Sequence, residues 1–324
     1  MRKISEYLLP ATAAVMLCWL AGTGNVPSAE AARVLPHPVL GAFVEGSTYS
    51  DTGDSDWDMP EKEQETVRKT FTLSAPAAER AVEIDNVTGS IDVVGTDANE
   101  VQLVVNQTFR AESKAKLAQA RKDVTLDITQ PDGSLRLYVN GPFRCGCNGG
   151  CCCGDSRDDE GYSVKMDFVL QVPRQVALRL KTVNEGEVHV KNVIGSFSVR
   201  NVNGGIEMED VAGSGSARTV NGGVKVAFRD NPHQDSDFAS INGGIELRFT
   251  KNLSADFQFK TFNGGIYSDF PVTALPVHAM QEEHRGAKVI FRANRFTGGR
   301  VGSGGPEIKV ENLNGDIRIL ENHE

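Results

Sequence analysis

Apolar and polar residues alternate one by one in short runs through the second half of the chain. The runs begin at Ile206, Val224 and Ile245, and each places apolar side chains on one face and mostly charged side chains on the other. A period of two residues is typical of β-strands that have one buried side. The pattern therefore predicts half-buried strands at 206–209, 224–228 and 245–249.

A tetrad of Asn, Gly, Gly and an aliphatic residue precedes each of these runs. It occurs first at Asn203 and returns after 18, 21 and 21 residues. Because Asn and Gly tolerate positive φ, each tetrad predicts a sharp corner between two extended segments. With a related Asn-Gly pair near the C-terminus, the predicted corner residues are Asn203, Gly204, Asn221, Gly222, Asn242, Gly243, Asn263, Gly264, Asn314 and Gly315.

Weaker corners at 184–186, 194–196 and 212–214 divide the segment 184–221 into units of 9 or 10 residues, and two units make one coil of 18–21 residues. One coil cannot close a core, so successive coils must stack and share an apolar interior. We expect an all-β fold, a β-solenoid resembling a parallel β-helix, with an antiparallel β-sandwich as the alternative. Stacked corner Asn side chains would hydrogen-bond in a ladder, and a ligand-binding Asn row is the competing interpretation.

The first half of the chain predicts a less regular β portion, 66–175, that is continuous with the repeat portion, 176–321. Residues 111–122 are rich in helix formers, and Glu112 lies four residues before Lys116, so we expect one short helix there. This portion should seal one end of the stack, with the strand 317–320 near the other end. The strands expected before the repeats are 70–73, 82–84, 91–93, 101–105, 123–129, 134–140 and 162–172.

The N-terminus resembles a cleaved secretory signal over residues 1–31. Arg2 and Lys3 precede an apolar stretch from Leu8 to about Ala21, and small residues follow up to Ala31. Residues 32–65 are acidic with little apolar periodicity and predict a disordered linker. No later stretch is long enough to span a membrane. We expect export to the periplasm, the cell surface or the medium; a retained N-terminal anchor is the alternative.

Charge and composition narrow the class of partner. The formal net charge is -9 and 24% of residues are charged, with no basic patch along the sequence. This balance argues against a nucleic-acid partner.

All the cysteines that follow the signal lie in one loop between two predicted strands. In an exported chain, disulfides are the favoured state of such a loop. If the thiols stay reduced, Zn or Cu(I) binding is an alternative, and a redox site is a third. An odd number leaves at least one thiol unpaired within the loop. The residues are Cys145, Cys147, Cys151, Cys152 and Cys153.

No catalytic motif emerges from the sequence. The histidines are scattered, His189 falls in an outward strand position, and there is no Gly-x-Ser-x-Gly, His-Glu-x-x-His or phosphate loop. Outward carboxylates such as Glu207, Glu209 and Glu246 recur from coil to coil, as in a solubilising surface. We expect a non-enzymatic structural or adhesin-like protein that binds an envelope polymer or protein. A glycan-acting enzyme and a metal-binding envelope protein are the alternatives.

The order of these features resembles a known family over residues 66–321. The Asn-Gly corners, the early helix, Val172-Pro173 and the closing segments 304–308 and 314–319 are similar to those of the bacterial envelope β-strand-repeat proteins described as candidate adhesins, a domain of unknown function. The resemblance implies a surface or periplasmic, non-enzymatic role and transfers no catalytic or binding residues. The cysteine-rich loop and the segment 268–300, where the spacing lapses, depart from it.

Overall fold

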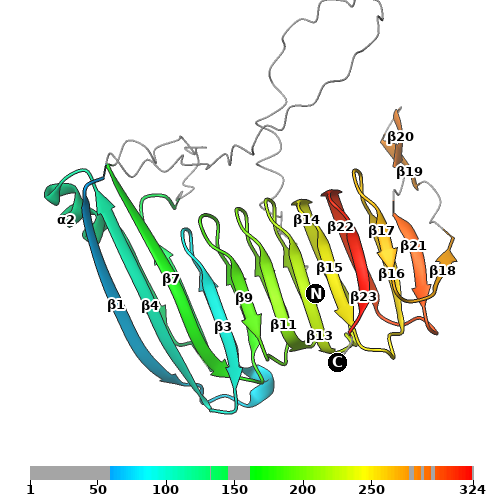
Figure 1. The fold of residues 1–324 in the computed structure, drawn as a ribbon, viewed down its shortest axis with the longest axis horizontal. Helices are drawn as coiled ribbons and strands as arrows, with labels where there is room; N and C mark the ends of the chain where they lie inside the picture. The colour runs from blue at the N-terminus through cyan, green and yellow to red at the C-terminus, as the bar shows by residue number, and fades with distance from the viewer. Residues whose placement is uncertain are drawn as a thin grey trace, which may run out of the picture. The chain divides into compact units, whose positions relative to one another are not determined.

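The computed structural model describes residues 59–131, 133–144, 161–276, 281–285, 288–292 and 296–322. In this part of the chain the fold is nearly all β, with two large mixed sheets, a small hairpin and one α-helix (Figure 1). The expected all-β class is therefore confirmed, and two facing sheets also fit the sandwich alternative. The predicted signal at 1–31 lies outside the described residues.

Sheet A is the ten-stranded sheet. In spatial order its strands are β1 (Glu61–Thr72), β4 (Glu100–Ala111), β7 (Tyr162–Pro173), β3 (Ile91–Thr96), β9 (Val188–Lys191), β11 (Ile206–Ala212), β13 (Val224–Asp230), β15 (Ile245–Phe249), β23 (Ile317–Glu321) and β17 (Ile266–Ser268).

Sheet B is the eleven-stranded sheet. Its strands are β18 (Val272–Leu275), β21 (Thr297–Val301), β16 (Ala255–Lys260), β22 (Glu307–Asn314), β14 (Ser236–Asn242), β12 (Gly215–Arg218), β10 (Phe197–Arg200), β8 (Ala177–Lys181), β2 (Ala81–Asp85), β6 (Ser134–Asn140) and β5 (Thr125–Thr129). The separate hairpin joins β19 (Gln281–Arg285) to β20 (Lys288–Arg292).

Consecutive strands from β8 to β17 alternate between the two sheets. Within each sheet, strands two apart in sequence pair in parallel from β8 to β15. The register keeps equivalent positions together, so that Val224 lies opposite both Ile206 and Ile245. This parallel pairing differs from the antiparallel pairing of the sandwich alternative. Antiparallel pairs occur toward the ends of the sheets, as between β1, β4 and β7 and between β16, β21 and β18.

The order of strands departs from the order of the sequence at both ends of the sheets. The last two strands insert between earlier ones, with β22 between β14 and β16 and β23 between β15 and β17. At the other end, β2 lies between β6 and β8, and β3 lies between β7 and β9. The strand expected at 317–320 is therefore next to the last in sheet A, with β17 outside it.

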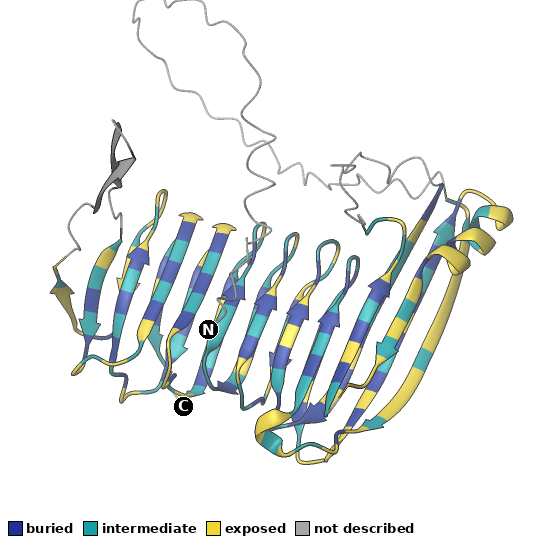
Figure 2. Ribbon diagram, turned by 180° about the vertical axis from the view of Figure 1, so that it is seen from behind, coloured by how far each residue is buried: buried dark blue, intermediate teal, exposed yellow. Residues whose placement is uncertain are grey.

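The N-terminal end carries the predicted helix and a long edge strand. Helix α2 (Lys114–Asp123) begins after Ser113, whose hydroxyl accepts a hydrogen bond from the Lys116 amide at 3.3 Å. Strand β1 begins at Glu61, so the expectation of a linker over the whole of 32–65 is wrong at its end. The reason is that an edge strand needs few apolar residues: Val67 and Phe71 pack on the core, and the side chains after Glu61 are otherwise exposed (Figure 2).

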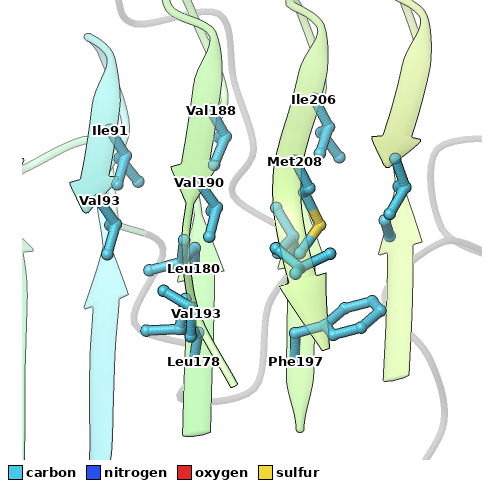
Figure 3. Packing of buried hydrophobic residues seen from close by; sticks show 14 of the residues in the cluster. Ile91, Val93, Leu178, Leu180, Val188, Val190, Val193, Phe197, Ile206 and Met208 are labelled. Carbon is cyan, nitrogen blue, oxygen red and sulfur yellow. The ribbon is translucent and has the colours of Figure 1, made fainter. Parts of the chain in front are cut away.

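One apolar interior fills the space between the sheets. Figure 3 shows Val188 and Ile206 from sheet A pointing into the same space as Leu180 and Phe197 from sheet B. Toward the C-terminal end, aromatic rings take over the packing: Phe228 stacks on Phe249 with ring centroids 5.1 Å apart. The shared interior is what the period-two pattern of the repeats predicts.

Candidate functional site

The predicted corner asparagines lie in a row at the connections from sheet B to sheet A. The Asn203 Nδ2 donates to Asn184 Oδ1 at 2.9 Å, and Asn221 donates to Asn203 at 2.8 Å. The row continues through Asn242, Asn314 and Asn263, each donating to the preceding amide at 2.8 Å. Asn314 thus falls between Asn242 and Asn263, because β22 lies between β14 and β16.

A second row of polar side chains lies buried beneath the ladder. The residue two positions before each corner Asn is Thr, Ser or Asn, and its side chain donates to the carbonyl of a glycine in a neighbouring corner. Thr219 Oγ1 donates to Gly204 O and Ser240 Oγ to Gly222 O, both at 2.8 Å, and Asn201 Nδ2 donates to Gly186 O at 2.9 Å. These three side chains are buried, so each supplies a bond that water cannot.

The two glycines of a tetrad are not equivalent. Gly204 has φ +158°, and a Cβ there would overlap the carbonyl oxygen of Gly186 in the neighbouring corner. At Gly205 the nearest atom to an added Cβ is the Gly223 carbonyl oxygen, 3.6 Å away, which is an ordinary contact. The close approach of neighbouring corners therefore depends on the first glycine.

The cysteines of the predicted loop, Cys145, Cys147, Cys151, Cys152 and Cys153, lie outside the described residues. Their segment joins β6 to β7, the same crossing from sheet B to sheet A that the Asn-Gly-Gly corners make in later coils. In the part of the chain that the structure describes, no group of three or more His, Cys, Asp or Glu side chains is arranged to hold a metal.

The outer face of sheet A carries charged side chains that alternate in sign across the strands. The register places Lys225 on β13 between Glu207 on β11 and Glu246 on β15. Glu246 also pairs with Arg248 at 2.8 Å, and Glu209 pairs with Lys191 at 2.9 Å. The predicted carboxylates Glu207, Glu209 and Glu246 are thus outward but do not form one acidic row, since cations lie between or beside them.

A histidine meets several carboxylates on this face. His189 Nε2 lies 3.2 Å from Glu187, its Nδ1 lies 3.7 Å from Glu207, and Asp92 is opposite it on β3. Burial raises the pKa of the Asp92 carboxyl, His189 opposes that shift and Asp167 adds to it. These side chains lie on the outer strand surface of sheet A.

A pocket of about 300 Å³ lies elsewhere, at the N-terminal end between β1, β4 and β5. Its apolar lining includes Val67, Phe109, Leu126 and Ile128. Glu65 and Arg121 are charged residues of the same lining. This region closes the space between the two sheets beside α2, and no residue singled out by the sequence analysis lines it.

The outer face of sheet B brings together three cations that the sequence analysis missed. Arg200 on β10 lies opposite Lys181 on β8 and opposite Arg218 on β12. Asp85 lies 3.5 Å from Lys181, and Asp237 lies 2.7 Å from Arg218. A signal was present in the sequence, because each cation directly precedes the buried polar residue of its corner.

No family model and no curated protein matches this chain. It is similar to the solved structure of a candidate cell adhesion protein from Clostridium sporogenes ATCC 15579, with 8% identity and a TM-score of 0.35, over 80% of this chain and 100% of that one.

Two further solved structures are similar at the same level. One is a candidate adhesin from Bacteroides fragilis NCTC 9343, with 10% identity and a TM-score of 0.30, over 80% of this chain and 97% of that one. The other is a candidate lipid binding protein from Parabacteroides distasonis ATCC 8503, with 10% identity and a TM-score of 0.26, over 79% and 96%. At these scores the likeness carries no argument about binding. None of the described helices has the length and hydropathy to cross a bilayer.

Proposed function

We propose that this chain is a non-enzymatic, adhesin-like binding protein of the bacterial envelope, built as a β-solenoid with two strands in each coil. One observation carries the proposal: parallel pairing in register repeats the same outward position from coil to coil. On sheet A this aligns Glu207, Lys225 and Glu246 across three neighbouring strands. A polymer or protein with its own repeat meets a charged side chain at the same register position on each of these strands.

Such a surface binds by the sum of many weak contacts. Each exposed ion pair or hydrogen bond contributes little alone, but linked contacts act at high effective concentration and raise the overall affinity. The outer faces of both sheets offer side chains of this kind without a deep cavity. Envelope polymers, whose subunits repeat along a chain, fit a surface that repeats along the coil axis.

Export to the envelope is part of the proposal. It uses residues 1–31 as the secretory signal and the acidic residues that follow as a tether to the β portion. N-terminal sequencing of the protein recovered from periplasm, cell surface and medium tests this step. A start near residue 32 supports export with cleavage, whereas a chain that keeps Met1 and stays in the cell body contradicts it.

A binding experiment tests the outer face of sheet A. Purified protein is incubated with isolated envelope fractions, and the bound fraction is measured for wild type and for a triple variant that neutralises carboxylates on β11 and β15. The substitutions are Glu207→Gln, Glu209→Gln and Glu246→Gln. We expect the variant to bind differently from wild type while keeping its unfolding temperature, since all three side chains point outward.

A matched control removes the same number of negative charges from exposed sites in the N-terminal portion. Its substitutions are Glu79→Gln, Glu100→Gln and Asp127→Asn. Equal binding by both triple variants and wild type would argue against the sheet A face. No binding of the wild-type chain to any envelope fraction would contradict the proposed function itself.

A glycan-acting enzyme is the second candidate, and the proximity of Asp92, His189 and Glu207 is the observation that favours it. It predicts turnover of envelope polysaccharides that Asp92→Asn abolishes. Metal binding through Cys145, Cys147, Cys151, Cys152 and Cys153 remains a prediction from the sequence. Elemental analysis for zinc and copper, together with a thiol titration of freshly isolated protein, tests it: five free thiols would contradict the disulfide interpretation.

A further inference from the structure

The outer face of strands β8, β10 and β12 carries positive charge without any acidic side chain of its own. Lys181, Arg200 and Arg218 share one register level, and we call them the basic row. Neighbouring strands lie about 4.8 Å apart, so the three side chains start from adjacent positions. Arg179, two residues before Lys181 on the same face of β8, adds a fourth cation.

The basic row works against the stability of the sheet. Like charges at directly opposite cross-strand positions repel, whereas opposite charges attract. Sheet A follows the favourable rule, because Lys225 lies between Glu207 and Glu246. Sheet B breaks this rule at three successive strands in a protein whose formal net charge is -9.

Ion pairs relieve only the two ends of the basic row. Lys181 lies 3.5 Å from Asp85, and Arg218 lies 2.7 Å from Asp237. Between them Arg200 is exposed, has a cation on each side and forms no ion pair with another described residue. Arg179 differs, because the register places it opposite Glu83 on β2. An anion lying across the three strands would satisfy these guanidinium groups and remove the repulsion.

We propose that the basic row binds an acidic polysaccharide, which runs across the strands from coil to coil. A guanidinium group forms paired hydrogen bonds with a carboxylate or a sulfate, so Arg200 at the centre of the row is the main anchor. Between the cations, Ser198 and Ser216 offer hydroxyl groups at one register level, and these suit the hydroxyls of a sugar chain. This inference rests on the proposed function and names the chemical class of its partner.

The composition of the same face separates a glycan from a single-stranded nucleic acid. Nucleic-acid grooves of this kind combine cations with aromatic side chains on which bases stack. No outward residue of β8, β10 or β12 is aromatic, since the outward positions hold Ala, Ser, Arg and Lys. The surface therefore offers charge and hydroxyl groups without a stacking platform.

The test measures binding of the full exported chain to polygalacturonate, heparin and neutral dextran by isothermal titration calorimetry at 50 mM and 200 mM NaCl. We expect binding to one or both acidic glycans, none to dextran, and weaker binding at the higher salt concentration because surface charges are screened. Binding to polygalacturonate would show that carboxylates suffice, whereas binding to heparin alone would show that sulfate groups are required. Arg200→Glu should weaken the binding at least tenfold.

Two further variants keep the test decisive. Arg68→Glu makes the same charge change at an exposed strand position on β1, outside both proposed binding faces, and should alter affinity less than twofold. Arg200→Gln should weaken binding while its melting temperature stays equal to that of wild type or rises, because it removes a repulsive contact. A lowered melting temperature with unchanged binding would assign Arg200 a structural role and overturn the inference.

Other results would also overturn it. Equal loss from Arg200→Glu and Arg68→Glu would show a general charge effect. Single-stranded DNA of matched charge that binds as tightly as the glycan would remove the assignment to polysaccharide. Binding of the wild type to envelope fractions without binding to either acidic glycan would leave the proposed function standing and refute only the basic row. Binding to acidic glycans without binding to any envelope fraction would support the basic row and contradict the proposed function.

Discussion

Substitution of Thr219 by Val tests whether the buried polar row holds neighbouring coils together. The Thr219 hydroxyl is 2.8 Å from the Gly204 carbonyl oxygen, and its residue is only 5% exposed. Val has nearly the same shape but donates no hydrogen bond. The variant therefore leaves a corner carbonyl without its donor at a place that water does not reach.

The size of the effect follows from two opposing contributions. An unsatisfied buried acceptor costs about 1–3 kcal/mol. Replacing the hydroxyl by a methyl returns up to about 0.8 kcal/mol through apolar burial. We expect a net loss of about 1–2 kcal/mol in the free energy of unfolding, and for a chain of this size a fall in melting temperature of about 2–8 °C.

Urea unfolding and thermal melts followed by circular dichroism measure this loss. Two controls locate its cause. Thr219→Ser keeps the hydroxyl. Thr219→Asn supplies an amide donor instead, as Asn201 and Asn312 do at the equivalent position of their own corners, where each donates to a glycine carbonyl at 2.9 Å. Both should lose less than Thr219→Val. If the Val variant were as stable as wild type while the Ser variant were less stable, side-chain packing and not the hydrogen bond would explain the stability of this corner.

Three more predictions concern the same framework. Gly204→Ala should lower the free energy of unfolding by about 2 kcal/mol or more, through backbone strain and overlap with the neighbouring corner, whereas Gly205→Ala should be neutral or slightly stabilising. Urea unfolding midpoints of the two variants test this. Equal losses would refute the difference between the two glycines. Asp92→Asn should be more stable than wild type at pH 7, because the pKa of the Asp92 carboxyl is raised in the folded state, so that ionising it above its unfolded pKa of about 3.8 costs stability. This advantage should vanish below that pH. A variant less stable than wild type at pH 7 would contradict burial as the cause of the raised pKa. Phe228→Ala should cost about 3–5 kcal/mol by opening a cavity beside Phe249, and a smaller loss would mean that the aromatic core collapses around the gap.

Much of the local structure was predictable because it depends on short stretches of chain. Alternating apolar positions fixed the strands around Ile206, Val224 and Ile245, and the Asn-Gly corners fixed where the chain turns between the sheets. The helix near 111–122 was predictable from helix formers and forms at 114–123. Strand β1 was missed at its start, since an edge strand buries few side chains and leaves a charged sequence looking like a linker.

The basic row shows a limit of reading the chain in order. Lys181, Arg200 and Arg218 lie far apart in a sequence whose surrounding charges are mixed, and each looks like an isolated surface cation. Only parallel pairing in register puts them side by side. Aligning the residues just before Thr182, Asn201 and Thr219 would have revealed the row, since that position repeats in every coil.

By itself, the sequence determined that these residues form strands, where the corners fall and which faces are apolar, because each depends on a residue and its near neighbours. It did not determine which strand lies beside which in each sheet. The repeated strands offer similar apolar inner faces and the repeated corners are alike, so many orders would satisfy the local pattern equally well. The tertiary structure decides the order: β21 occupies one side of β16 in an antiparallel pair, which leaves β22 to pair on the other side, between β16 and β14, and places Asn314 between Asn242 and Asn263.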